Sequence, residues 1–217
     1  MSIKPILIVA GEPNSVFLEI FFKSIKKINY SSPLIIIVSK KLLVEQMIKL
    51  GFKYKINLIE KNYKDFSKLN NKKINLINVN YNFKKPFEKI TVRSNNYINN
   101  CFNIALEILK KKKLSKFING PISKKHFLKG KKLGITEYLA QKTKRKNKVA
   151  MLIFNKKLSV SPITTHLALK DVNKHISKKK IDMHINLISK FYKKNFKKNP
   201  KIAITGLNPH CESNFKD

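Results

Sequence analysis

The stretch Pro5–Ile28, PILIVAGEPNSVFLEIFFKSIKKI, indicates the fold class. Its apolar run predicts a buried strand, Gly11 predicts a tight turn, and the apolar residues that follow recur at helical spacing. Asn14 or Ser15 is the expected N-cap of that helix. The stretch therefore predicts a β-α unit.

The same alternation continues along the first half of the chain. The run SPLIIIVS, residues 32–39, is typical of a strand covered on both faces, and KKLLVEQMIKLG, residues 40–51, predicts a helix that ends at Gly51. Further strands are expected in YKINLIE, KINLINVN and KFINGPISK. In NNYINNCFNIALEILKKKK, a helix is expected to place four residues along one face: Tyr97, Cys101, Ala105 and Ile108. Strands that alternate with helices predict an α/β fold with a largely parallel, helix-covered sheet.

The second half gives weaker signals. KVAMLIFNKKLSVSPITTH, residues 148–166, resembles two strands joined across Asn155–Lys157. A long helical stretch is expected from Leu169 to Phe196, with a break near Lys178–Lys180, and PKIAITGL is expected to form the last strand. Because no linker or internal repeat is present, residues 1–217 are expected to lack a clean internal domain boundary.

Composition limits the classes of function. The chain has 47 basic and 12 acidic residues, a net charge of +35, yet Arg93 and Arg145 are the only arginines. Lysine lacks the bidentate fork that reads bases and phosphates, so a nucleic-acid partner is not favoured. A non-catalytic module that binds polyanions remains the alternative. Cys101 and Cys211 are in no CxxC pair, and no apolar run approaches the ~20 residues of a membrane span. These features predict a cytoplasmic protein.

The five histidines differ in context. His184 shares a helix face with apolar residues, which predicts a packed side chain, whereas His175 lies among lysines and is expected to be solvated. His126 could be packed or solvated. His166 and His210 follow expected strands in polar turns, where two neutral imidazoles could begin a divalent metal site. The alternative is two surface histidines.

Two loops suit an anionic ligand such as phosphate. NGPISK offers Ser123 as a donor and Lys124 as a charge, and GITE places Thr136 at the start of a helix, where free N–H groups attract anions. Both loops could equally be ordinary turns and caps. The dinucleotide fingerprint is missing, since GEPNSV has one glycine where that motif has three.

Taken together, five segments resemble the 4-hydroxythreonine-4-phosphate dehydrogenase family of pyridoxal phosphate biosynthesis in order and approximate spacing: GEPNSVFLEI, NGPISK, GITEYLA, SPITTHLALKDV and ITGLNPHCES. The resemblance implies a homodimer with an isocitrate/isopropylmalate dehydrogenase-like fold. It implies NAD(P)-dependent oxidation of a small phosphorylated hydroxy-amino acid, with loss of carbon dioxide. It also implies that His166 and His210 bind a divalent metal, zinc, magnesium or cobalt, at the dimer interface. Thr136 would contact the substrate phosphate, and Lys124 would lie near the substrate.

The chain departs from the family pattern in three places. Residues 14–17 replace the glycines of the family's first turn, and Ile135 stands where the family has a substrate-contacting histidine. Family members also continue beyond the position of Asp217 with a segment that holds a third metal histidine and most cofactor contacts. We therefore expect the fold to be incomplete at its C-terminus and this chain alone to be inactive.

Overall fold

The computed structural model describes residues 4–128, 134–145 and 148–207. The chain divides into two compact units, Met1–Ile135 and Thr136–Asp217. The division falls at the first residue of helix α4 (Ile135–Lys142).

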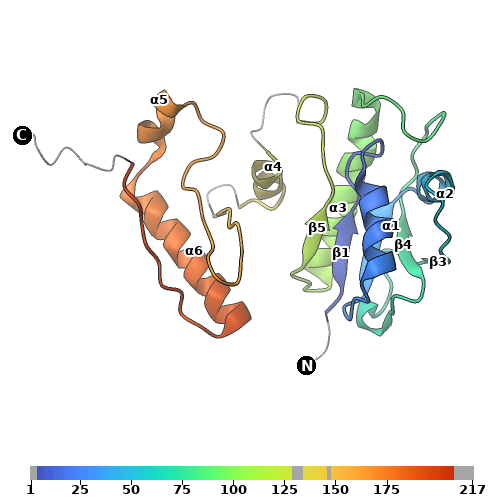
Figure 1. Ribbon diagram of the computed structural model, residues 1–217, viewed down its shortest axis with the longest axis horizontal. Helices are drawn as coiled ribbons and strands as arrows, with labels where there is room; N and C mark the ends of the chain where they lie inside the picture. The colour runs from blue at the N-terminus through green and yellow to red at the C-terminus, as the bar shows by residue number, and fades with distance from the viewer. Residues whose placement is uncertain (1–3, 129–133, 146–147, 208–217) are drawn as a thin grey trace, which may run out of the picture. The chain divides into compact units, whose positions relative to one another are not determined.

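The first unit contains a parallel β-sheet in the order β3-β4-β2-β1-β5 (Figure 1). The strands are β1 (Ile6–Val9), β2 (Leu34–Val38), β3 (Ile56–Leu58), β4 (Ile74–Asn78) and β5 (Phe117–Asn119). All four strand pairs are parallel, and each strand lies within a stretch predicted from the sequence.

Three long helices connect the strands: α1 (Phe17–Lys27), α2 (Lys40–Lys49) and α3 (Asn95–Lys111). Two short 3-10 turns, Phe66–Lys68 and Val92–Ser94, lie in the connections that precede β4 and α3. All three helices confirm the predictions.

Helices α1 and α2 begin in different ways, and the N-cap predicted for α1 is wrong. Ser39 caps α2, its Oγ accepting a hydrogen bond from the Leu42 backbone N–H. The N-cap of α1 is Val16, which has no side-chain capping bond, so neither Asn14 nor Ser15 occupies that position. Ser15 Oγ instead accepts a bond from the Phe17 backbone N–H, at the first residue of the helix.

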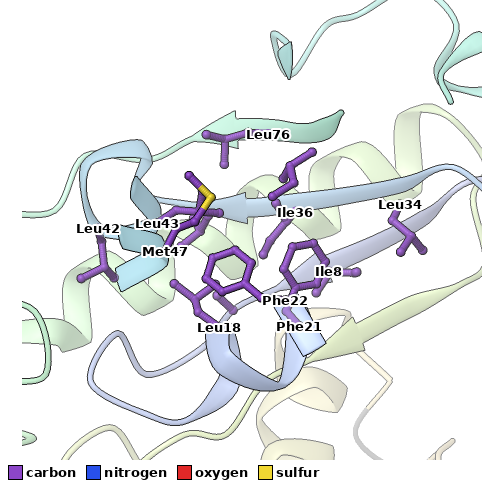
Figure 2. Close-up of a cluster of buried hydrophobic side chains, with 13 residues drawn as sticks. Ile8, Leu18, Phe21, Phe22, Leu34, Ile36, Leu42, Leu43, Met47 and Leu76 are labelled. Atoms are coloured by element: carbon purple, nitrogen blue, oxygen red, sulfur yellow. The ribbon is translucent and has the colours of Figure 1, made fainter. Parts of the chain in front are cut away.

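The main core lies between the sheet and the helices α1 and α2. Alternate side chains of a strand point to one face, and the even-numbered residues of β1, β2 and β4 face these two helices. Figure 2 shows Phe21 and Phe22 of α1 and Met47 of α2 gathered against Ile36 of β2. Burial of each such side chain contributes roughly 1.5–3 kcal/mol to stability, which fixes the carboxyl ends of the strands in place.

Helix α3 covers the opposite face of the sheet. Its predicted apolar stripe of Tyr97, Cys101, Ala105 and Ile108 is buried, as are the odd-numbered residues of β2. Burial raises the pKa of the Cys101 thiol to about 12, which suits a structural residue and not a reactive thiolate. With both faces covered, β2 has the continuous apolar sequence expected of a central parallel strand.

In its described part, the second unit contains helices and irregular segments. Helices α5 (Leu169–Val172) and α6 (Lys178–Phe196) are separated by a 3-10 turn and by Ser177, whose Oγ accepts a bond from the Lys180 backbone N–H. The break predicted near Lys178–Lys180 is therefore present, just before α6.

Three strands expected in this unit are absent from the described residues. The segment 148–166 forms only an isolated antiparallel bridge between Ile153 and Val160, and residues 200–207 form no strand. The side chains of Ile153, Val160 and Ile204 are 61%, 53% and 61% exposed. Apolar runs become strands only when a neighbouring strand completes the hydrogen-bond ladder, and the described part of the unit supplies none. Among the same residues, no helix is long and apolar enough to cross a membrane.

Candidate functional site

The sheet has a reversal of strand order between β1 and β5. The chain leaves β1 toward β2 on one side, and after α3 it returns to β5 on the other side of β1. The loops that follow these two strands, the β1 loop and the β5 loop, therefore lie side by side at the carboxyl edge of the sheet. In open α/β sheets this is the position where ligands bind.

These two loops contact each other through their backbones. The Gly120 N–H donates to Val9 O at 2.8 Å, and the Glu12 N–H donates to Pro121 O at 2.8 Å. A Cβ atom on Gly120 would collide with the Ala10 carbonyl, and one on Gly11, where φ is +78°, would collide with the Pro121 carbonyl. Glycine is therefore required for this close approach.

Glu12 is buried at the centre of this region, with 3% of its surface exposed. Its Oε2 accepts a hydrogen bond from Ser94 Oγ at 2.9 Å, and its Oε1 accepts one from the Asn14 N–H at 3.3 Å. Burial raises the pKa of Glu12 above its ordinary 4.5, while these hydrogen bonds and nearby His126 oppose the rise. Hydrogen bonds from two segments thus hold the carboxyl group in place at the carboxyl edge of the sheet.

A second set of bonds attaches the β5 loop to the start of α3. Asn95 Nδ2 donates to His126 O at 2.9 Å, while Ser123 Oγ accepts the His126 N–H at 3.2 Å. The Phe127 N–H donates to Ser123 O at 2.8 Å, so residues 123–127 form a compact turn. Lys124 lies on this turn, where its ammonium can meet an anion from solution.

The sequence-predicted residues are divided between the two units. Lys124 and Ile135 belong to the first unit, and Thr136 and His166 to the second. Thr136 is the second residue of α4, as expected for a helix start with unbonded backbone N–H groups, and both it and Ile135 are partly buried. His210 lies outside the described residues.

His166 has a left-handed backbone, with φ of +57°. It stands in a bend and not at the end of a strand, because residues 148–166 form only the single bridge between Ile153 and Val160. No group of three His, Cys, Asp or Glu side chains gathers among the described residues. The imidazole of His166 is a suitable donor for a divalent ion, but the described residues supply no complete ligand set for one.

The other histidines take the places that their contexts suggest. His184 is 6% exposed, its Nδ1 lies 3.4 Å from Ser161 Oγ, and burial lowers its pKa below the ordinary value. The prediction of a packed residue is confirmed. His175 is exposed, with Nδ1 2.8 Å from Asp171 O, which confirms the prediction of a solvated side chain. His126 is partly buried on the β5 loop.

Sequence reasoning missed the polar residues that join the loops, above all Glu12, Ser94 and Asn95. Gly-Glu-Pro directly after a strand was a usable signal, since an acidic residue in that position lies over the carboxyl edge of the sheet. Nothing local indicates that Ser94 meets Glu12, because 82 positions separate them.

Comparison with known proteins identifies a family. The family model for "Pyridoxal phosphate biosynthetic protein PdxA" matches residues 29–215. A 4-hydroxythreonine-4-phosphate dehydrogenase of Sulfurihydrogenibium sp. (strain YO3AOP1) is 34% identical over 211 residues, which cover 95% of this chain and 64% of the relative. The enzyme of the same name from Wigglesworthia glossinidia brevipalpis is 29% identical over 213 residues, covering 96% and 63%. This chain therefore spans slightly less than two thirds of these relatives.

Solved structures show the same fold. The 4-hydroxythreonine-4-phosphate dehydrogenase of Klebsiella pneumoniae matches with a TM-score of 0.78 at 21% identity, over 97% of this chain and 66% of that one. The enzyme from Burkholderia phymatum matches with the same TM-score at 22% identity, over 97% and 64%. The expected α/β fold with a largely parallel, helix-covered sheet is confirmed. With the family model covering most of its length, the chain belongs to the PdxA family of pyridoxal phosphate biosynthetic proteins.

Proposed function

We propose that this chain carries the N-terminal part of a metal- and NAD(P)-dependent 4-hydroxythreonine-4-phosphate dehydrogenase. The reaction would oxidise 4-phosphohydroxy-L-threonine, with loss of carbon dioxide, in pyridoxal 5'-phosphate biosynthesis. The observation that carries the proposal is the family match over residues 29–215, which include the loop after β5. Oxidation gives a β-keto acid, whose carboxylate leaves easily.

The β5 loop and the start of α4 are the proposed contacts for the substrate. Lys124 offers a positive charge on the loop, and Thr136 offers a hydroxyl in the first turn of α4. Both groups suit a phosphate monoester, which carries about two negative charges at neutral pH. Ile135 brings an apolar side chain to the same turn and cannot donate a hydrogen bond, so the phosphate must rely on the other donors.

His166 and His210 are the proposed metal ligands, at the interface of a homodimer. A divalent ion would lower the pKa of the substrate hydroxyl and stabilise the negative charge that develops as hydride leaves. Zinc, magnesium and cobalt are the candidate ions. Two histidines are fewer than the three protein ligands typical of catalytic zinc sites, which is one reason to expect no turnover from this chain alone.

The metal assignment can be tested on the 217-residue chain. Zinc or cobalt binding should weaken in His166→Ala and remain unchanged in His175→Ala, because His175 is a solvated histidine of the same unit. Isothermal titration with the metal salt measures this directly. Equal loss in the two variants, or none in either, would contradict a site at His166.

The assignment of activity is tested by assay. The chain alone, supplied with metal, NAD and 4-phosphohydroxy-L-threonine, should produce no NADH. A chain extended by the codons that follow Asp217, if they encode a Tyr-His-Asp-Gln-Gly segment in frame, should turn over. Turnover by the 217-residue chain at roughly 1 per second or more would refute the expected dependence on further residues. A folded extended enzyme that leaves this substrate unchanged would refute the proposed reaction.

A further inference from the structure

We propose that Glu12 is a positioning residue, whose buried side chain joins the first turn after β1 to the start of α3 and so holds the β5 loop that carries Ser123 and Lys124. The role of this loop in ligand binding rests on the proposed function. The attachment of the loop to the rest of the unit does not depend on that function and can be measured separately.

Burial of the Glu12 carboxyl group is costly. Glu12 is the only buried acidic residue among residues 4–128, 134–145 and 148–207. Burying a carboxyl group is expensive unless its hydrogen bonds are satisfied, and an apolar residue of similar size would often be more stabilising. A carboxyl group in this place is therefore better explained by the geometry that it imposes than by the stability that it adds.

Three segments that are distant in sequence meet at Glu12. Its own N–H donates to Pro121 O of the β5 loop, and its Oε2 accepts from Ser94 Oγ, next to the first residue of α3. The side chain of Asn95, the first residue of α3, donates to His126 O, which lies in the β5 loop. Glu12 thus closes a ring of hydrogen bonds between the β1 turn, the start of α3 and the β5 loop.

The Ser94 hydroxyl has one hydrogen but two acceptors within bonding distance. These are Glu12 Oε2 at 2.9 Å and Thr91 O at 3.1 Å. A donor at position 12 would resolve this competition, because Ser94 could then give its hydrogen to Thr91. Glutamine supplies such a donor and keeps an oxygen for the Asn14 N–H, so Glu12→Gln preserves the ring.

Two substitutions separate positioning from bulk packing. Glu12→Leu keeps a side chain of similar size but removes both side-chain hydrogen bonds, whereas Glu12→Gln keeps them. Glu19→Leu is the matched control, since it removes a carboxylate from nearby α1 that pairs with Lys23 on the same helix. Ser94→Ala removes the partner hydroxyl without altering position 12.

The experiment is amide hydrogen exchange on the full 217-residue chain, with no substrate or cofactor added. In Glu12→Leu, exchange at His126 and Phe127 should rise at least roughly tenfold, while the amides of β2 keep their wild-type rates. Ser94→Ala should change the same amides in the same direction. Glu12→Gln should stay within about threefold of the wild type, and Glu19→Leu should have no effect on this loop.

Three results would overturn the proposal. One is unchanged exchange at His126 and Phe127 in Glu12→Leu. Another is an equal rise in the loop and in β2, which would show general destabilisation. The third is amide exchange at His126 and Phe127 that rises as much in Glu12→Gln as in Glu12→Leu. If Glu12→Leu does not fold, Ser94→Ala provides the test: exchange at His126 and Phe127 should rise in this variant, and unchanged exchange would overturn the proposal. Failure of the proposed dehydrogenase activity would leave every one of these outcomes unaffected.

Discussion

Replacing Gly120 with alanine should disrupt the contact between the β1 and β5 loops, because the backbone of the β1 loop already fills the space that the added methyl group needs. The new Cβ would overlap the Ala10 carbonyl oxygen and would lie 2.8 Å from the side-chain Cγ of Phe17. Backbone atoms at the end of a central strand cannot move aside as the end of a flexible side chain can. Overpacking of this kind typically costs 1–3 kcal/mol, and the backbone overlap places Gly120→Ala at about 3 kcal/mol.

Gly51→Ala is the control for this experiment. Gly51 has φ of +71° at the end of α2, and nothing lies within 4 Å of an added Cβ. The substitution therefore strains the backbone but causes no collision. The strain costs about 1–2 kcal/mol, and the lower entropy of the unfolded chain offsets part of this cost. Its net cost should be about 1 kcal/mol.

The assay is thermal unfolding followed by circular dichroism. For a chain of this size, a 1 kcal/mol loss lowers the midpoint by about 2–4 °C, so Gly120→Ala should lower it by about 6–12 °C and Gly51→Ala by about 2–4 °C. Equal shifts, or a smaller shift for Gly120→Ala, would refute the claim that close contact between the β1 and β5 loops excludes a side chain.

Three further predictions concern the substrate, pH and salt. In an extended, active enzyme, Ile135→His should tighten binding of the phosphorylated substrate by about 1–3 kcal/mol in a calorimetric titration, because imidazole can donate a hydrogen bond; weaker binding would point to another pose. Burial lowers the pKa of His184 below 6.5, so the folded state resists its protonation and stability should fall as pH drops through the unfolded value. The midpoint in urea should decline below about pH 6.5 in the wild type and less so in His184→Gln; equal declines would assign the effect to other groups. A polyanion-binding module should lose affinity for a nucleic-acid oligomer by roughly one log unit per log of salt for each phosphate contacted. We expect instead that this chain binds such an oligomer only weakly at physiological salt.

The first unit could be predicted well because its signals are local. The runs around Leu7, Ile36 and Leu76 are rich in apolar residues, and each is followed by a helix, a polar turn or a glycine. Such patterns depend on residues a few positions apart, which a single sequence displays directly. The helix stripe of Tyr97, Cys101, Ala105 and Ile108 is of the same kind.

The second unit and the contacts of the β1 loop could be predicted less well because their determinants are not local. The strands expected around Ile153, Val160 and Ile204 depend on neighbouring strands, and an apolar run does not show whether these exist. The contact of Glu12 with Ser94 depends on the strand order, which brings the end of β1 beside the start of α3. Of the predicted site residues, the helix start at Thr136 is confirmed, and the roles of Lys124, His166 and His210 remain predictions.

The placement of β5 beside β1 has a consequence for the order of folding during synthesis. In this register Leu7 lies opposite Phe117, so the partner of β1 on that side emerges from the ribosome roughly 110 residues later. The strands β1, β2, β3 and β4 can associate earlier, because their pairings involve chain that has already been made. Non-local pairing forms slowly, since loop closure comes before its contacts are gained. The β5 edge should therefore be the last part of the sheet to assemble, and until then the unpaired backbone edge of β1 stays open to the chaperones that receive a nascent chain.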